Sequence, residues 1–401
     1  MSHSYSLKKL FIFSFAIYLI LYFSNQYYSL EDMILIGFTD QLQYLKIVDE
    51  PNNLTNIEIS IQHRYRFLIP YIVGTISSLL QIQNNFILFS IVMILLNVLI
   101  LHTFNKIVLY LDVKKNFSLI IISALIFNAY MFRPAIINPI LINDWLFTYG
   151  LLLITTYILK KKEGYFYFGL ILCSITRQTS QILNLVFLFV ILYNFIFKKK
   201  IKTDIYFYGI IINISIFIFL STISSNLFGS FNEDTFINYI IGIFYFEYSL
   251  FDLTMFILQF LNTYSFEIIL FIFFIANFLS YKKFLKFEII LIGILALSIW
   301  IQPFLAGPSV TYGNISRLTI LSLPVILVFF LYIFKEINIK SSYTVIIILL
   351  LGISSFHHHY SYFFNYFFDY KNFHFAIINS FLNFIILTIL IKNNYDLKLA
   401  K

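Results

Sequence analysis

The sequence predicts an all-α membrane protein, a polytopic bundle of about 11–13 spans of roughly 20 apolar residues each. The prediction rests on composition. Hydrophobic residues make up 60% of the 401-residue chain, aromatic residues 20% and charged residues only 11%, with a mean hydropathy of +0.86. A soluble domain carries charge on roughly a quarter of its residues. We therefore expect most of the chain to lie within a lipid bilayer.

Apolar runs that could cross about 30 Å of hydrocarbon follow one another along the chain. Segment 67–82 is shorter and is broken by Pro70, so it either crosses the bilayer or lies in its interface. No soluble domain, linker or internal repeat interrupts the pattern, and we treat 1–401 as one membrane domain. The spans are expected at residues 8–25, 86–105, 117–132, 145–160, 165–177, 181–197, 205–224, 263–280, 287–303, 317–334, 342–356 and 375–391.

The lysines determine the expected topology, because short cytoplasmic loops are enriched in Lys and Arg. If 67–82 does not cross, 20 of the 22 lysines fall on one side, and only Lys46 and Lys371 fall on the other. If it crosses, the lysines of loop 106–115 move to the wrong side. We therefore prefer the first topology, with the N- and C-termini in the cytoplasm and the protein in the plasma membrane.

The five arginines follow a different pattern. In this topology all of them fall on or near the extracytoplasmic side. A guanidinium is a permanently charged planar group that pairs with phosphate or carboxylate, and ionisable groups near membrane depth are candidates for function. Any one arginine could simply anchor a helix end. Together they predict an anionic, membrane-associated ligand whose phosphate would be bound by Arg64, Arg66, Arg133, Arg177 and Arg317.

The first extracytoplasmic segment, 26–85, is the longest polar interruption in the chain. It contains the candidate acid Asp40, and a second candidate acid, Asp144, stands at the start of a later span. A carboxylate at the membrane surface can remove a proton from an acceptor hydroxyl, while arginines on the same side can stabilise a departing phosphate. We therefore predict Asp40 as a general base and Asp144 as an assisting group that binds the acceptor or a metal.

The same residues resemble the GT-C superfamily of polytopic glycosyltransferases, which use sugars linked to polyprenyl phosphate. The matching elements are DQLQY, with Asp40 and Tyr44, then HRYRFLIP from His63 to Pro70, and Asp144 as the second acid. The resemblance implies helices in the extracytoplasmic loops and places Tyr44, His63 and Tyr65 against the substrate. The chain lacks a second acid beside Asp40, which leaves a divalent cofactor such as Mg²⁺ or Mn²⁺ open. We predict no protein metal ligands.

These features predict a hexosyltransferase that moves a sugar from a polyprenyl-phosphate donor to a glycan or lipid acceptor on the extracytoplasmic face. One alternative is a polymerase or ligase of the O-antigen type, in which outer arginines bind a polyprenyl-diphosphate-linked glycan. Another is a transporter or flippase for a lipid-linked glycan. Transporters commonly show repeated halves, which this sequence lacks. No nucleic-acid partner is expected.

Overall fold

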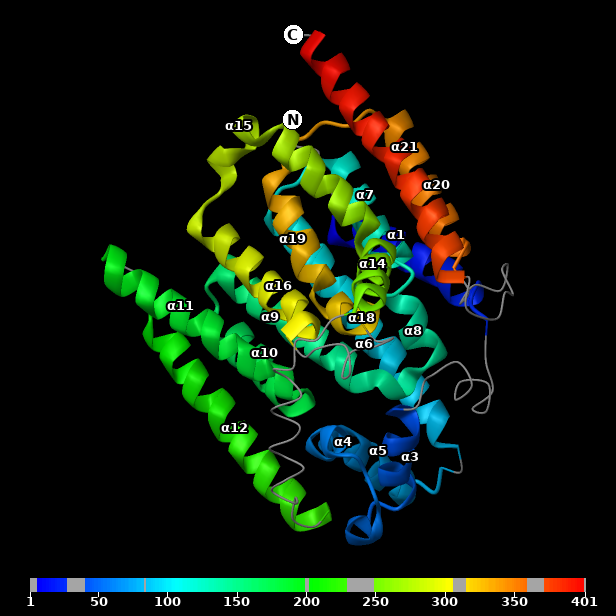
Figure 1. The fold of residues 1–401 in the computed structure, drawn as a ribbon, viewed down its shortest axis with the longest axis vertical. Helices are drawn as coiled ribbons and strands as arrows, with labels where there is room; N and C mark the ends of the chain where they lie inside the picture. The colour runs from blue at the N-terminus through cyan, green and yellow to red at the C-terminus, as the bar shows by residue number, and fades with distance from the viewer. Residues whose placement is uncertain are drawn as a thin grey trace.

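The described chain is helical. The computed structural model describes residues 6–26, 40–82, 84–198, 202–228, 249–305, 315–358 and 371–399. Within these ranges the backbone forms α-helices and short 3₁₀ helices (η), and no β-strand occurs there. The predicted all-α fold class is confirmed, and the helices form one bundle (Figure 1).

The helices alternate between long apolar elements and short connecting turns. In chain order they are α1 (Leu7–Phe23), α3 (Asp40–Asp49), η1 (Leu54–Asn56), α4 (Ile61–Tyr65), α5 (Leu68–Leu79), α6 (Asn85–Tyr110), α7 (Lys115–Phe127), α8 (Phe132–Ile137), η2 (Pro139–Leu141), α9 (Ile142–Lys160), α10 (Glu163–Thr176), η3 (Gln178–Gln181), α11 (Ile182–Phe197), α12 (Asp204–Phe228), α14 (Leu250–Ala276), α15 (Phe278–Tyr281), η4 (Lys282–Phe284), α16 (Phe287–Leu305), α18 (Ile315–Thr319), η5 (Ile320–Ser322), α19 (Leu323–Ile333), α20 (Ser341–Phe356) and α21 (Lys371–Leu399).

Each predicted span overlaps one of these helices or a pair of them. By length and composition, seven helices in the described ranges could cross a membrane, and an eighth span results if α15–η4 and α16, bent by 103°, count as one. The other predicted spans coincide with α1, α7, α10 and α20, which are shorter, with 13 to 17 residues. The protein is therefore a multi-pass membrane protein.

The lysine-bearing connections meet at one end of the bundle, which we call the lysine end. This end includes α15 and the C-terminal end of α21, and it lies opposite α3, α4 and α5 (Figure 1). The predicted topology requires the lysine-bearing connections to lie at one end. That this end faces the cytoplasm stays a prediction. The contacts that join these connections are Lys114 N to Lys335 O at 3.1 Å, Lys340 N to Asn393 Oδ1 at 3.1 Å, and the ion pairs Lys161–Glu288 and Lys283–Glu336, both at 3.7 Å.

Segment 40–82, which is predicted to be extracytoplasmic, folds as a small helical unit, α3 to α5, at the other end. Helix α5 has 12 residues and is therefore about 18 Å long, close to the 13 residues of α7. Its Val73 and Ser77 are buried, while Ile72 and Ile76 on the other side are exposed. An apolar face of this kind suits a helix lying in the membrane interface. That 67–82 does not cross the bilayer stays a prediction.

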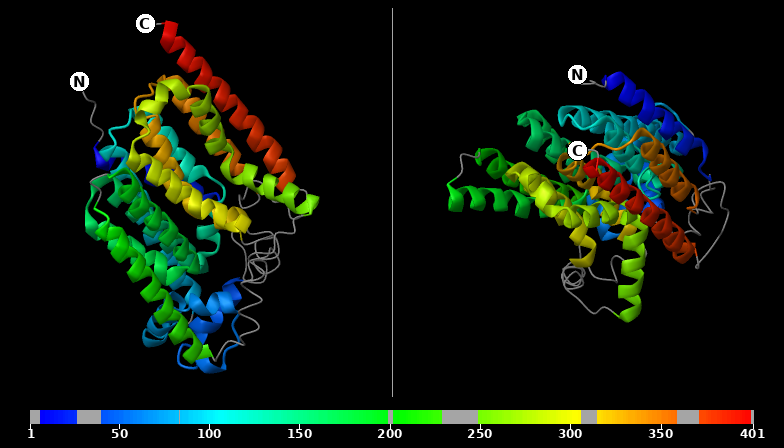
Figure 2. Two further views of the ribbon diagram at one scale, coloured as in Figure 1. Left: turned by 60° about the vertical axis from the view of Figure 1, so that its left-hand side comes forward. Right: turned by 90° about the horizontal axis from the view of Figure 1, so that it is seen from above.

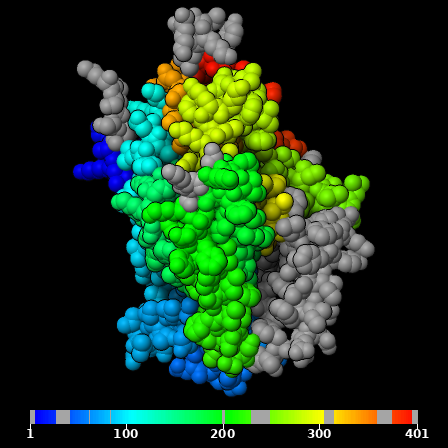
Figure 3. All heavy atoms as spheres, turned by 90° about the vertical axis from the view of Figure 1, so that its left-hand side faces the viewer, coloured from blue at the N-terminus to red at the C-terminus, as the bar shows by residue number. Residues whose placement is uncertain are grey.

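Helices α11 and α12 pack beside each other and cover one face of the bundle (Figures 2 and 3). Their outward side chains are large and apolar, for example Leu192 and Ile218, which are 49% and 58% exposed. An exposed apolar surface of this extent suits contact with lipid. The C-terminal half of α12 also holds the α3–α5 unit, because Phe217 packs on Tyr65 and Phe228 packs on Phe67.

Helix α9 lies at the centre and contacts α6, α10, α16 and α19. Its closest neighbour is α10, and the two backbones approach each other at Gly150 and Gly169. A Cβ atom added at either glycine would lie 2.6 Å from the carbonyl oxygen of the other. Only glycine permits this approach without moving the backbone, so the pair determines how closely α9 and α10 pack.

We predict that Gly169→Ala destabilises the protein, by about 1–3 kcal/mol, because the added methyl group overlaps backbone atoms of α9. The matched control is Gly164→Ala in the same helix, where an added Cβ meets nothing within 4 Å. This control should leave stability unchanged or raise it slightly, since alanine favours the helix. Thermal unfolding midpoints of the detergent-purified variants would test the prediction, and equal midpoints would contradict it.

Candidate functional site

Asp144 lies in the first turn of α9 and is only 1% exposed. Helix α9 begins at a buried turn that contains Pro139, so the start of the helix and its first acid lie inside the protein. The Asp144 carboxylate has both oxygens engaged. Oδ2 accepts a hydrogen bond from Arg317 Nε at 2.7 Å, and Oδ1 accepts one from Arg177 Nη1. A buried carboxylate requires such partners, because an unpaired charge in the interior is costly.

The arginines come from separate parts of the chain. Arg177 directly follows α10 and is 1% exposed, whereas Arg317 lies in α18 and its side chain is 15% exposed. Arg66 follows α4, is buried, and donates from Nε to Gln178 Oε1 at 3.1 Å. Its charge also acts on Asp144 and Arg177. We call these four residues the arginine cluster.

The arginine cluster carries more positive than negative charge. Three guanidinium groups and one carboxylate give a formal charge of +2. In addition, Arg177 Nε is buried and has no hydrogen-bond partner among the described residues. Guanidinium groups pair well with phosphate and carboxylate groups, because their planar set of N–H donors matches the oxygen acceptors. The arrangement can therefore accept an anion, with Arg317 as its most exposed member.

The structure brings together three of the five predicted phosphate-binding arginines. Arg133 is fully buried in other contacts: its Nη1 donates to Asn25 Oδ1 at 2.7 Å, and its Nε donates to Ser355 Oγ at 3.1 Å. These contacts tie α8 to the ends of α1 and α20. Arg64 donates from Nε to Ile59 O at 2.8 Å, within the turn before α4. A role in phosphate binding stays a prediction for both.

Asp40 is the first residue of α3, and its side chain lies outside the described part of the structure. Its predicted role as general base is therefore untested by geometry. The helical segment that it opens is consistent with the extracytoplasmic loop helices implied by the resemblance.

The three predicted substrate contacts lie in the interior of the α3–α5 unit. Tyr44 is buried and packs edge-on against His63 at 5.1 Å between ring centroids, while Ser60 Oγ lies 2.5 Å from His63 Nδ1. Tyr65 is also buried, and its hydroxyl donates to Ser174 O at 3.4 Å. In these contacts the residues hold the unit together and attach it to α10. Their contact with substrate stays a prediction.

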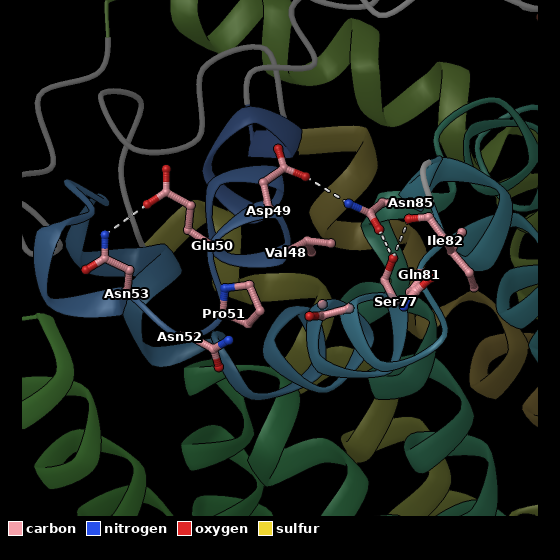
Figure 4. A pocket seen from close by; sticks show the side chains of 12 residues that line it. Val48, Asp49, Glu50, Pro51, Asn52, Asn53, Ser77, Gln81, Ile82 and Asn85 are labelled. Atoms are coloured by element: carbon pink, nitrogen blue, oxygen red, sulfur yellow. Dashed lines mark hydrogen bonds between the residues drawn. The ribbon is translucent and has the colours of Figure 1, made fainter.

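A polar pocket of about 410 Å³ lies between the end of α3, the turn after it, and α5 (Figure 4). Its polar wall consists of carboxylates, amides and hydroxyls, and no Lys, Arg or His of the described ranges lines it. Asn85 Nδ2 donates to Asp49 Oδ1 at 2.8 Å, and Asn53 Nδ2 donates to Glu50 Oε2 at 3.2 Å. The polar lining residues are Asp49, Glu50, Asn52, Asn53, Ser77, Ser78, Gln81 and Asn85.

Such a lining suits a neutral, hydroxyl-rich ligand, because carboxylates and amides accept hydrogen bonds from hydroxyls and amides also donate to them. This pocket is not among the features predicted from the sequence. The available signal was the density of polar residues in 49–53 and 77–85, two segments that the fold brings together by packing α3 on α5. Gly74 permits this packing, since a Cβ there would lie 2.6 Å from Val48 O.

In the ranges that the structure describes, no group of three or more His, Cys, Asp or Glu side chains could hold a metal ion. The single cysteine, Cys173, is buried in α10. No known protein family, curated protein or solved structure matches this chain. The arginine cluster and the polar pocket are therefore the features that indicate a function.

We predict that Asp144→Asn is strongly destabilising, by about 3–5 kcal/mol, because it leaves buried guanidinium groups without their counter-charge. The matched control is Glu163→Gln, which removes the ion pair of Glu163 with Lys202, a surface contact at 3.5 Å. Exposed pairs of this kind contribute little, so the control should unfold at the wild-type temperature. Thermal unfolding in detergent would measure both variants, and a wild-type midpoint for Asp144→Asn would refute the prediction.

Proposed function

We propose that this protein is a membrane glycosyltransferase that transfers a hexose from a polyprenyl-phosphate donor to a glycan or lipid acceptor on the extracytoplasmic face of the plasma membrane. The observation that carries the proposal is the arginine cluster, in which three guanidinium groups gather at Asp144 and Arg317 is partly exposed. A lipid-linked phosphate is an anion that guanidinium groups bind well. The polar pocket supports the proposal, because a sugar is a neutral, hydroxyl-rich ligand.

The reaction needs a base and a stabiliser of the leaving group. Asp40 would remove the proton from the acceptor hydroxyl, whose oxygen then attacks the anomeric carbon of the donor. The bond from that carbon to the phosphate oxygen breaks, and the lipid phosphate leaves with an added negative charge. Arg66, Arg177 and Arg317 would stabilise that charge. Asp144, held by two arginines, orients their guanidinium groups in this scheme.

A second candidate is a polymerase or ligase that acts on a polyprenyl-diphosphate-linked glycan. The same cluster favours it, because a diphosphate carries more negative charge than a monophosphate ester and would pair with several guanidinium groups. The two candidate functions differ in whether they require a catalytic carboxylate. The first requires Asp40 for proton removal, whereas the second depends chiefly on the arginines.

We predict that Asp40→Asn lowers sugar transfer at least about 100-fold while donor binding is retained, because a general base contributes about that much to the rate. The measurement uses purified protein and polyprenyl phosphate bearing a radiolabelled glucose, galactose or mannose. The control is Asp204→Asn at the lysine end, in the first turn of α12, which should transfer at the wild-type rate. Unchanged transfer by Asp40→Asn would remove this residue from catalysis.

Arg317→Gln tests the phosphate site in the same assay. We predict weaker donor binding and slower transfer, since the variant loses the most exposed charge of the cluster. Full activity of Asp40→Asn together with loss of activity in Arg317→Gln would favour the diphosphate-dependent polymerase or ligase. Wild-type donor binding by Arg317→Gln would contradict the proposed role of the cluster.

A further inference from the structure

A second buried carboxylate, Glu267, lies within α14, away from both the arginine cluster and the polar pocket in sequence and in contacts. Glu267 is 4% exposed, and neither of its carboxylate oxygens has a hydrogen-bond partner in another residue of the described chain. Helix α14 is one of the candidate membrane spans. An ionisable group in such a place is costly unless something compensates it, and it is a candidate for function by default.

Glu267 lines a small cavity of about 30 Å³ between α14, α7, α20 and α21. The space holds a single water-sized particle. Asparagine and serine side chains from α14, α20, α21 and the residue after α7 form its polar wall, and Glu267 is the only ionisable side chain among the described residues that line it. The cavity therefore combines one negative charge with neutral oxygen and nitrogen atoms.

A break in α14 explains why asparagine amides line this cavity. Tyr264 has non-helical backbone angles (φ −121°, ψ 19°), so carbonyl groups next to it lose their helical partners. Asn128 Nδ2 donates to Thr263 O at 2.7 Å, and Asn379 Nδ2 donates to Asn262 O at 3.3 Å. The amide donors on this side of the cavity are thus used to satisfy backbone carbonyls at the break.

Two further donors are also used. Asn383 Nδ2 donates to Asn379 O at 2.7 Å and lies 2.9 Å from Ser265 Oγ, and the Ser354 hydroxyl donates to Asn379 Oδ1. In contrast, both Glu267 oxygens and Asn383 Oδ1 are buried without a donor in the described chain. The cavity therefore has acceptors in excess of donors, and its natural ligand is positively charged.

We propose that this cavity binds one small monovalent cation of the size of Na⁺. The Glu267 carboxylate would balance its charge, and Asn383 Oδ1 would serve as a neutral ligand. A single carboxylate in the wall balances one positive charge and leaves a divalent ion undercompensated. The volume admits one bare ion, and oxygen atoms are the ligands that hard cations prefer. Broken membrane helices are known places for Na⁺ sites. The inference does not depend on the proposed transfer reaction.

The test is thermal unfolding of the full-length protein in detergent, at fixed pH and ionic strength, with NaCl replaced stepwise by choline chloride. Because an ion that binds only the folded state stabilises it, the wild-type unfolding midpoint should rise with Na⁺ concentration. Glu267→Gln, nearly identical in shape, should lose this dependence. The control is Glu288→Gln. The Glu288 carboxylate pairs with Lys161 at the protein surface, so this variant should keep the Na⁺ dependence.

Asn383→Ala provides a second variant should Glu267→Gln fail to fold. It keeps the carboxylate but removes a neutral ligand, so at least about tenfold more Na⁺ should be needed for the same midpoint. A wild-type midpoint that is equal in Na⁺ and choline would overturn the proposal, and so would a Na⁺ dependence in Asn383→Ala that is unchanged from that of the wild type. A midpoint that responds to pH but not to Na⁺ would show that Glu267 carries a proton instead, which also overturns it.

Discussion

The double ion pair of Asp144 with Arg177 and Arg317 is the interaction on which the half of the molecule opposite the lysine end depends. It joins the start of α9 to the end of α10 and to α18, and the two arginines lie 33 and 173 residues from Asp144 along the chain. Each partner is buried or nearly so, and each would be costly in the interior without the others. The cluster therefore constrains the fold and at the same time concentrates positive charge near the membrane surface.

The bundle has two chemically different ends. At the lysine end, hydrogen bonds and exposed ion pairs connect the lysine-bearing turns, and individual pairs there contribute little to stability. At the opposite end the ion pairs of Asp144 with Arg177 and Arg317 are buried or nearly so, and the α3–α5 unit holds a polar pocket. Lysines that orient a membrane protein need only to remain in water. Guanidinium groups that bind a ligand must be held in fixed positions.

Glycine permits two close approaches on which this arrangement depends. Gly150 and Gly169 bring α9 against α10, which positions Asp144 and Arg177 on adjacent helices. Gly74 brings α5 against the end of α3 and so closes one side of the polar pocket. In a protein whose core is otherwise uniformly apolar, side-chain hydrophobicity does not distinguish one helix pairing from another. Small residues and buried polar contacts provide that specificity.

Composition and hydropathy alone determined the fold class, the approximate position of every expected span and the grouping of lysines at one end, because each depends on local sequence and on the cost of placing charge in lipid. The sequence also singled out Asp144 and the arginines as unusual. Only the tertiary structure decided that Arg66, Arg177 and Arg317 gather around Asp144 while Arg133 binds Asn25 and Ser355. It alone revealed the polar pocket and the cavity at Glu267. The reason is physical: these sites join residues of different helices, some more than a hundred positions apart, and packing between helices leaves no local pattern in the sequence that would show which of them meet.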